Sequence, residues 1–142
     1  MFYQKNGNVI ALMPEIGEDI LTVLTELCEK ENIFYAHVSG IGAVSRATVG
    51  FYSLSEHRYI SKCFDEPMEM VSLLGNITRK DGKPYLHLHA SFSDKSCNVV
   101  GGHLNEAVIG VTAEIFITVI DGEMGRKINP VTGLNVFDIN NQ

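Results

Sequence analysis

The chain has 142 residues, of which 45% are hydrophobic and 20% charged, and its formal net charge is −6 at pH 7. These proportions are typical of a soluble globular protein and exclude a collagen-like repeat, a coiled-coil rod and an intrinsically disordered chain. The acidic excess leaves little with which to build a basic face, so bulk charge disfavours direct nucleic-acid binding by the isolated chain.

The first third of the chain contains the only strong helical pattern. Residues 9–13 predict a short strand that Pro14 ends. An amphipathic helix is expected from Gly17 to about Asn32, with Glu18 and Asp19 in its first turn. The apolar residues on its predicted inner stripe are Ile20, Leu21, Leu24, Leu27 and Cys28.

Strand patterns dominate the rest of the chain. Lys80 to Lys83 enclose Asp81-Gly82, a signal for a tight hairpin. The segment from Ser39 to Gly42 is expected to interrupt the strands on either side of it. The predicted strands are residues 33–38, 47–53, 59–64, 68–78, 85–92, 107–120 and 133–139. One helix and about seven strands predict an α+β fold with a mostly antiparallel sheet and one main flanking helix.

The composition is even along the chain, which predicts one domain over residues 1–142. No apolar run reaches the roughly 18 residues of a membrane span, and residues 1–8 lack the apolar core of a signal peptide. We therefore expect a cytoplasmic protein with no membrane association.

Three histidines form the clearest chemical pattern. His87 and His89 share one face of a predicted strand, because side chains alternate along a strand. Two such imidazoles can hold one metal ion, and a third from a neighbouring strand would complete a three-His site with a position open to water or substrate. His103 is the candidate third ligand, since Gly101 and Gly102 would let its backbone approach closely.

Imidazole nitrogen suits zinc, copper, nickel or iron, so the pattern alone does not fix the metal. The alternative interpretation is that the two strand histidines are only the polar face of an amphipathic strand. Glu66, Glu69 and Glu114 are carboxylates available beside a metal, and Glu69 or Glu114 would transfer protons there. Arg46 is a candidate anchor for a substrate carboxylate, because its guanidinium can bind one with two hydrogen bonds. Glu114 interrupts an apolar strand, so it is expected to be paired, metal-bound, at an interface or exposed at an edge.

Four segments of the chain follow one another in a recognisable order and spacing. They are residues 40–52 (GIGAVSRATVGFY), 66–77 (EPMEMVSLLGNI), 87–90 (HLHA) and 101–104 (GGHL). Together they closely resemble the plants-and-prokaryotes-conserved (PPC) domain family, over residues 9–139. The resemblance implies an antiparallel sheet with flanking helices, assembled as a homotrimer.

The resemblance has two functional implications. In plant members the domain follows AT-hook segments that bind the DNA minor groove, and it mediates assembly and partner contacts; the AT-hook core Arg-Gly-Arg-Pro is absent from this sequence. The fold is also similar to that of acetolactate decarboxylase, which holds zinc through an HxH pair and a later histidine. His87, His89 and His103 match that pattern, which implies a divalent metal, with zinc expected.

Two functional hypotheses follow. The first is a homotrimeric PPC module that carries the metal and associates with DNA or with transcription-associated proteins, with any DNA contact made by Arg79, Lys80 and Lys83 gathered from several subunits. The alternative is a metal-dependent enzyme of lyase or hydrolase type that acts on a small carbonyl or carboxylate substrate. A third reading is a metal-free trimer with His87 and His89 at an interface.

Overall fold

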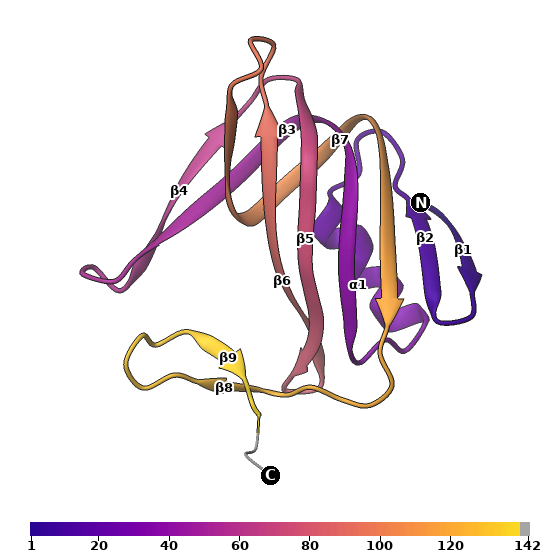
Figure 1. Cartoon of the computed structure of the whole chain (residues 1–142), viewed down its shortest axis with the longest axis vertical. Helices are drawn as coiled ribbons and strands as arrows, with labels where there is room; N and C mark the ends of the chain where they lie inside the picture. The colour runs from indigo at the N-terminus through magenta and orange to yellow at the C-terminus, as the bar shows by residue number, and fades with distance from the viewer. Residues whose placement is uncertain (140–142) are drawn as a thin grey trace.

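The computed structural model describes residues 1–139. Its main element is a seven-stranded sheet in the order β1-β2-β7-β6-β5-β3-β4, with antiparallel pairings throughout (Figure 1). Strand β3 also pairs with β7, so β3, β5, β6 and β7 form a closed ring of paired strands. The elements in chain order are β1 (Phe2–Asn6), β2 (Val9–Met13), α1 (Ile20–Lys30), β3 (Ala36–Ser53), β4 (Arg58–Phe64), β5 (Met68–Lys80), β6 (Lys83–Ser93), β7 (Val99–Val119), β8 (Arg126–Ile128) and β9 (Asn135–Phe137).

The predicted α+β class and antiparallel sheet are therefore confirmed, but strand boundaries differ. β3 runs without a break through the segment from Ser39 to Gly42, where the sequence predicted an interruption; the register only shifts there. A Cβ on Gly42 would lie 2.6 Å from the Thr112 carbonyl oxygen, so this glycine permits close strand contact rather than ending the strand. β1 and β8 were not predicted.

Helix α1 is shorter than predicted. It begins at Ile20, and Asp19 is its N-cap in extended conformation, so the expectation that Glu18 and Asp19 occupy the first turn is wrong. The Asp19 carboxylate accepts hydrogen bonds from the Thr22 backbone N–H and from the Ala107 N–H of β7, both at 3.0 Å. One side chain thus both caps the helix and joins it to the sheet. Among the described residues, no helix is long and apolar enough to span a membrane.

The alternation on β6 follows the prediction. Leu88, Ala90 and Phe92 are buried in the core that α1 also faces. His87 and His89 therefore project from the other side of the strand. The hairpin between β5 and β6 turns at Asp81 and Gly82, which both have positive φ, as predicted from their sequence.

Candidate metal site

The structure brings the three predicted histidines together. His89 on β6 is directly opposite His103 on β7, and His87 lies two residues before His89. The ring centroids of the three imidazoles are 5.4 to 5.5 Å apart. One nitrogen from each ring can be chosen so that all lie within 4.8 Å of one another, and no other such group of ligating side chains occurs within residues 1–139.

The two glycines before His103 explain how β7 reaches this position. A Cβ on Gly102 would lie 2.6 Å from the Gly50 carbonyl oxygen of β3, and one on Gly101 would lie 2.6 Å from the Ala90 carbonyl oxygen of β6. Real Cβ atoms do not approach an oxygen so closely, so side chains here would force the strands apart. The close approach predicted from the paired glycines is confirmed.

The surroundings favour neutral imidazoles. Burial, followed by the neighbouring His87 and His89, lowers the pKa of His103 to about 4. Burial also lowers the pKa of His87, and the positive charge of Arg126 adds to this effect. A neutral imidazole is the form that binds a metal, so the lowered pKa values keep His87 and His103 in the ligating state at neutral pH.

His103 Nδ1 gives a second indication of a missing partner. This nitrogen is buried and has no hydrogen-bond partner among the described residues. An unpaired buried polar atom is costly, and a metal ion or a water would satisfy it. The donor set and this nitrogen together fit a zinc ion.

A small cavity adjoins the histidines. Its volume is about 230 Å³. The residues that line it are Tyr59, Tyr85, His87, His103, Gly133, Leu134, Asn135 and Val136. The Tyr59 ring lies 4.9 Å from the His103 ring, centroid to centroid, and Asn135 Oδ1 is a further buried atom without a partner among the described residues.

Residues 133–136, in the turn and β9 of the C-terminal hairpin, form one wall of this cavity. Tyr52 on β3 donates a hydrogen bond to the Thr132 carbonyl oxygen in the turn of the hairpin. Arg126, at the start of β8, donates hydrogen bonds to Thr78 Oγ1 and Asn76 Oδ1 on β5. The hairpin is thus fixed at both ends against the main sheet.

Sequence reasoning missed several of these residues. Tyr85 could have been identified from the sequence, because strand alternation places its side chain on the same side of the strand as His87 and His89. Tyr59, Asn135 and Arg126 carry no local signal, since they reach the site only through the fold of β4 and of the C-terminal hairpin.

The predicted carboxylates lie elsewhere. Glu69 and Glu114 both line a second cavity of about 480 Å³, and neither belongs to the histidine group. Glu114 is exposed. Proton transfer by either residue stays a prediction.

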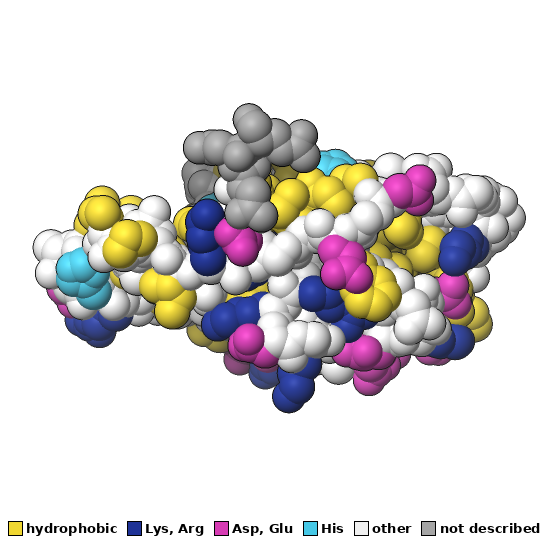
Figure 2. All heavy atoms as spheres, turned by 90° about the horizontal axis from the view of Figure 1, so that it is seen from below, with side chains coloured by type: hydrophobic (Ala, Val, Ile, Leu, Met, Phe, Trp, Pro, Cys, Tyr) yellow, Lys and Arg dark blue, Asp and Glu magenta, His cyan; other side chains and the backbone are white. Residues whose placement is uncertain are grey.

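The predicted basic cluster is smaller than its sequence indicated. Arg79 is largely covered, with its guanidinium hydrogen-bonded to the Ile33 and Cys28 carbonyl oxygens and paired with Glu29 at 3.3 Å. Lys80 and Lys83 remain at the hairpin. On the face seen in Figure 2, positive and negative side chains are intermixed and form no continuous basic surface.

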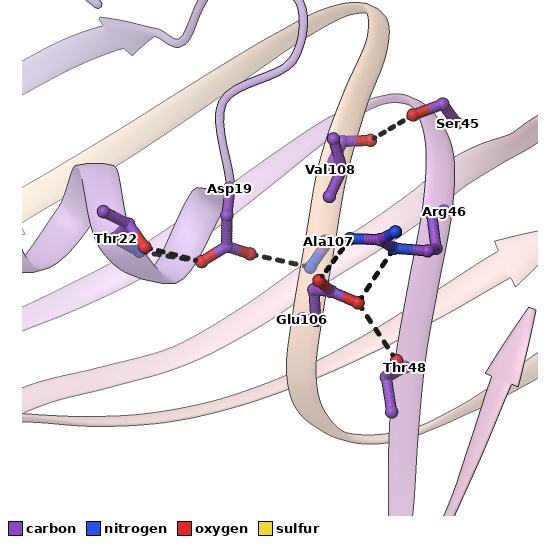
Figure 3. Close-up of polar contacts among 8 residues, drawn as sticks. All are labelled: Asp19, Thr22, Ser45, Arg46, Thr48, Glu106, Ala107 and Val108. Atoms are coloured by element: carbon purple, nitrogen blue, oxygen red, sulfur yellow. Dashed lines mark hydrogen bonds and ion pairs between the residues drawn. The ribbon is translucent and has the colours of Figure 1, made fainter. Parts of the chain in front are cut away.

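Arg46 is engaged by a carboxylate of its own chain. Its Nη2 and Nε donate hydrogen bonds of 2.7 and 3.1 Å to the two oxygens of Glu106, and Thr48 Oγ1 donates a third (Figure 3). This pairing raises the pKa of Arg46. A substrate carboxylate would have to compete with Glu106 for this guanidinium.

The fold and the three clustered histidines define a class of small antiparallel-sheet proteins with a candidate open metal site. The family model described as the Plants and Prokaryotes Conserved (PCC) domain matches residues 1–121. The chain belongs to this family, the one that its four sequence segments resemble. None of the curated proteins searched matches its sequence.

Solved structures agree with the family. A candidate DNA-binding protein from Bacteroides thetaiotaomicron shares 30% identity, with 96% of each chain covered and a TM-score of 0.94. A metal-containing protein from Archaeoglobus fulgidus shares 33% identity over 96% of this chain and 98% of that one, with a TM-score of 0.87. A plant- and prokaryote-conserved protein from Pyrococcus horikoshii shares 27% identity over 99% and 97%, also with a TM-score of 0.87.

The likeness to acetolactate decarboxylase is one of fold. The enzyme from Bacillus subtilis strain 168 has 16% identity and a TM-score of 0.58, with 91% of this chain and 60% of the enzyme covered. The predicted similarity of fold is confirmed, and a shared fold does not carry a shared reaction.

Proposed function

We propose that His87, His89 and His103 hold one divalent metal ion, with zinc the expected ion, and that the site serves metal-dependent chemistry on a small molecule. The clustering of three imidazole nitrogens within 4.8 Å, with no protein carboxylate or thiolate in the described group, carries this proposal. Three protein ligands leave a position open, as in catalytic rather than structural zinc sites. A metal-containing relative supports it further.

The activity that fits this arrangement is that of a lyase or hydrolase acting on a small carbonyl or carboxylate substrate. A bound zinc would supply Lewis-acid polarisation of a substrate oxygen. Tyr59 and Tyr85 line the cavity beside the histidines and offer hydroxyl groups to a ligand. Leu134 and Val136 of the hairpin give the cavity an apolar wall.

The test is the metal content of untagged protein, measured by elemental mass spectrometry. We expect about one zinc per chain in the wild type and none in a His87→Ala/His89→Ala double variant. A His37→Ala/His57→Ala double variant is the matched control, because neither residue belongs to the cluster. Equal metal content in the wild type and the His87→Ala/His89→Ala variant would contradict the proposal.

A second candidate function is that of a homotrimeric module associated with DNA or transcription-associated proteins. Relatives from Bacteroides thetaiotaomicron and Ralstonia eutropha are candidate DNA-binding proteins. An exposed apolar patch supports self-association: Ile41, Leu74 and Phe116 are 57%, 51% and 52% exposed. Ser39 on β3 is opposite both Leu74 and Phe116, so these side chains lie on one face across three neighbouring strands.

Two measurements test this candidate. Light scattering should give the mass of three chains. Binding to duplex DNA should weaken as salt rises and should fall in a Lys80→Gln/Lys83→Gln variant. Background binding in low salt would exclude direct DNA contact and leave contact with proteins.

A further inference from the structure

Arg126 is a cation beside the candidate metal site that the chain does not neutralise. Its guanidinium carbon lies 4.7 Å from the centre of the Tyr85 ring and 4.5 Å from that of Phe137, between the two rings. Its hydrogen bonds go to neutral oxygens, those of Thr78 and Asn76. No carboxylate lies within 4.0 Å of it among residues 1–139, and its Nη1 has no hydrogen bond there.

The nearby carboxylates do not pair with Arg126. Asp138, which follows the hairpin, pairs with Lys127 at 3.0 Å, and Glu123, three residues before Arg126, is exposed and forms no ion pair with it. None of the residues that line the cavity is acidic. A divalent ion on three neutral histidines, together with Arg126, would carry three positive charges without an acidic partner among the described residues. Unbalanced charge in a half-buried site is unfavourable, so the site favours an anion.

We propose that the cavity beside the three histidines binds a small carboxylate, and that Arg126 supplies the positive charge that selects it over a neutral analogue. This inference rests on the proposed metal site. Arg126 does not itself line the cavity, but Tyr85, which does, stacks on the Arg126 guanidinium, so the positive charge lies next to the cavity wall. The cavity volume of about 230 Å³ fits a ligand smaller than a drug-sized molecule.

The proposal assigns carboxylate recognition to Arg126 and not to Arg46, the candidate from the sequence. Glu106 occupies the guanidinium of Arg46 with two hydrogen bonds, whereas the described carboxylates leave Arg126 unpaired. Arg126 lies outside residues 1–121, the part that the family model matches. Selection of the ligand would thus depend on a segment that the family pattern does not describe.

The experiment uses cobalt-loaded protein, because the visible spectrum of bound cobalt reports a ligand that enters the metal site. Pyruvate is the probe and pyruvamide its neutral counterpart. We expect pyruvate to bind the wild type roughly tenfold or more tightly than pyruvamide. Arg126→Gln should weaken pyruvate binding by roughly tenfold or more, because one positive charge at the cavity wall is lost, and leave pyruvamide binding unchanged.

Three variants separate charge from structure. Arg126→Lys keeps the charge and should retain most of the preference for pyruvate. Tyr52→Phe removes the hydrogen bond between Tyr52 and Thr132 and loosens the hairpin without changing charge, so it should keep the preference too. Arg46→Gln should behave as the wild type.

The outcomes distinguish this inference from the metal proposal. Cobalt bound normally, with equal affinity for pyruvate in the wild type and Arg126→Gln, would overturn the inference alone. Loss of the preference in Tyr52→Phe as large as in Arg126→Gln would overturn it as well, since hairpin placement would then account for the effect. Failure of the wild type to bind cobalt would overturn both proposals.

Discussion

The metal-free protein should lose stability on mild acidification because His103 resists protonation in the folded state. Its pKa is about 4 in the fold and about 6.5 in the unfolded chain. Between these values the unfolded chain binds a proton that the folded chain does not, so the free energy of unfolding falls as pH falls through this window. From pH 7 to pH 5 this one group contributes a loss of about 2 kcal/mol at most.

The assay is urea denaturation of chelator-treated protein, followed by circular dichroism at both pH values and at one chain concentration. His103→Gln is the matched control, because glutamine fills similar space and does not titrate. We expect the wild type to lose about 2 kcal/mol more than the variant between the two pH values. An equal loss in both proteins would refute the account of a buried, neutral His103.

Three further predictions concern the scaffold and the assembly. Asp19→Ala removes the helix cap and the hydrogen bond to the Ala107 N–H (Figure 3). Denaturation should show that the free energy of unfolding falls by about 1–2 kcal/mol. An unchanged denaturation midpoint would contradict the capping role. Gly102→Ala places a Cβ 2.6 Å from the Gly50 carbonyl oxygen and should weaken zinc binding in a calorimetric titration. Gly125→Ala is the control, because its Cβ would meet only Asp138 at 3.7 Å and zinc affinity should not change. Equal zinc affinities of the two variants would refute the strand-contact argument. Leu74→Glu puts a charge in the exposed apolar patch and should reduce the mass seen by light scattering to that of one chain, and an unchanged mass would exclude the patch as the interface.

Local patterns were sufficient to predict the histidine cluster. Strand alternation placed His87 and His89 on one side, and the two glycines before His103 indicated that its strand lies close to a neighbour. Both signals are contained in a few adjacent residues, and the register of β6 against β7 then sets His89 opposite His103. The cluster itself was therefore within reach of sequence reasoning.

The surroundings of the cluster depend on contacts between distant segments. Tyr59 comes from β4 and Arg126 from β8, and nothing near either residue indicates which part of the sheet it will contact. Glycine was also ambiguous in the sequence: at Gly42 it allows close contact within a continuous β3, although it was read as part of an interruption. The pairing of Arg46 with Glu106 also carries no local signal, because the two residues are 60 positions apart in the chain.

X-ray absorption of the zinc-loaded protein tests the central claim most directly, since it reports the atoms bound to the metal. Ligation by His87, His89 and His103 predicts about three imidazole nitrogens at about 2.0–2.1 Å, with a light atom completing the shell. The exposed thiols of Cys63 and Cys97 are the alternative ligands. Sulfur at about 2.3 Å, or a shell without imidazole, would contradict the three-histidine site.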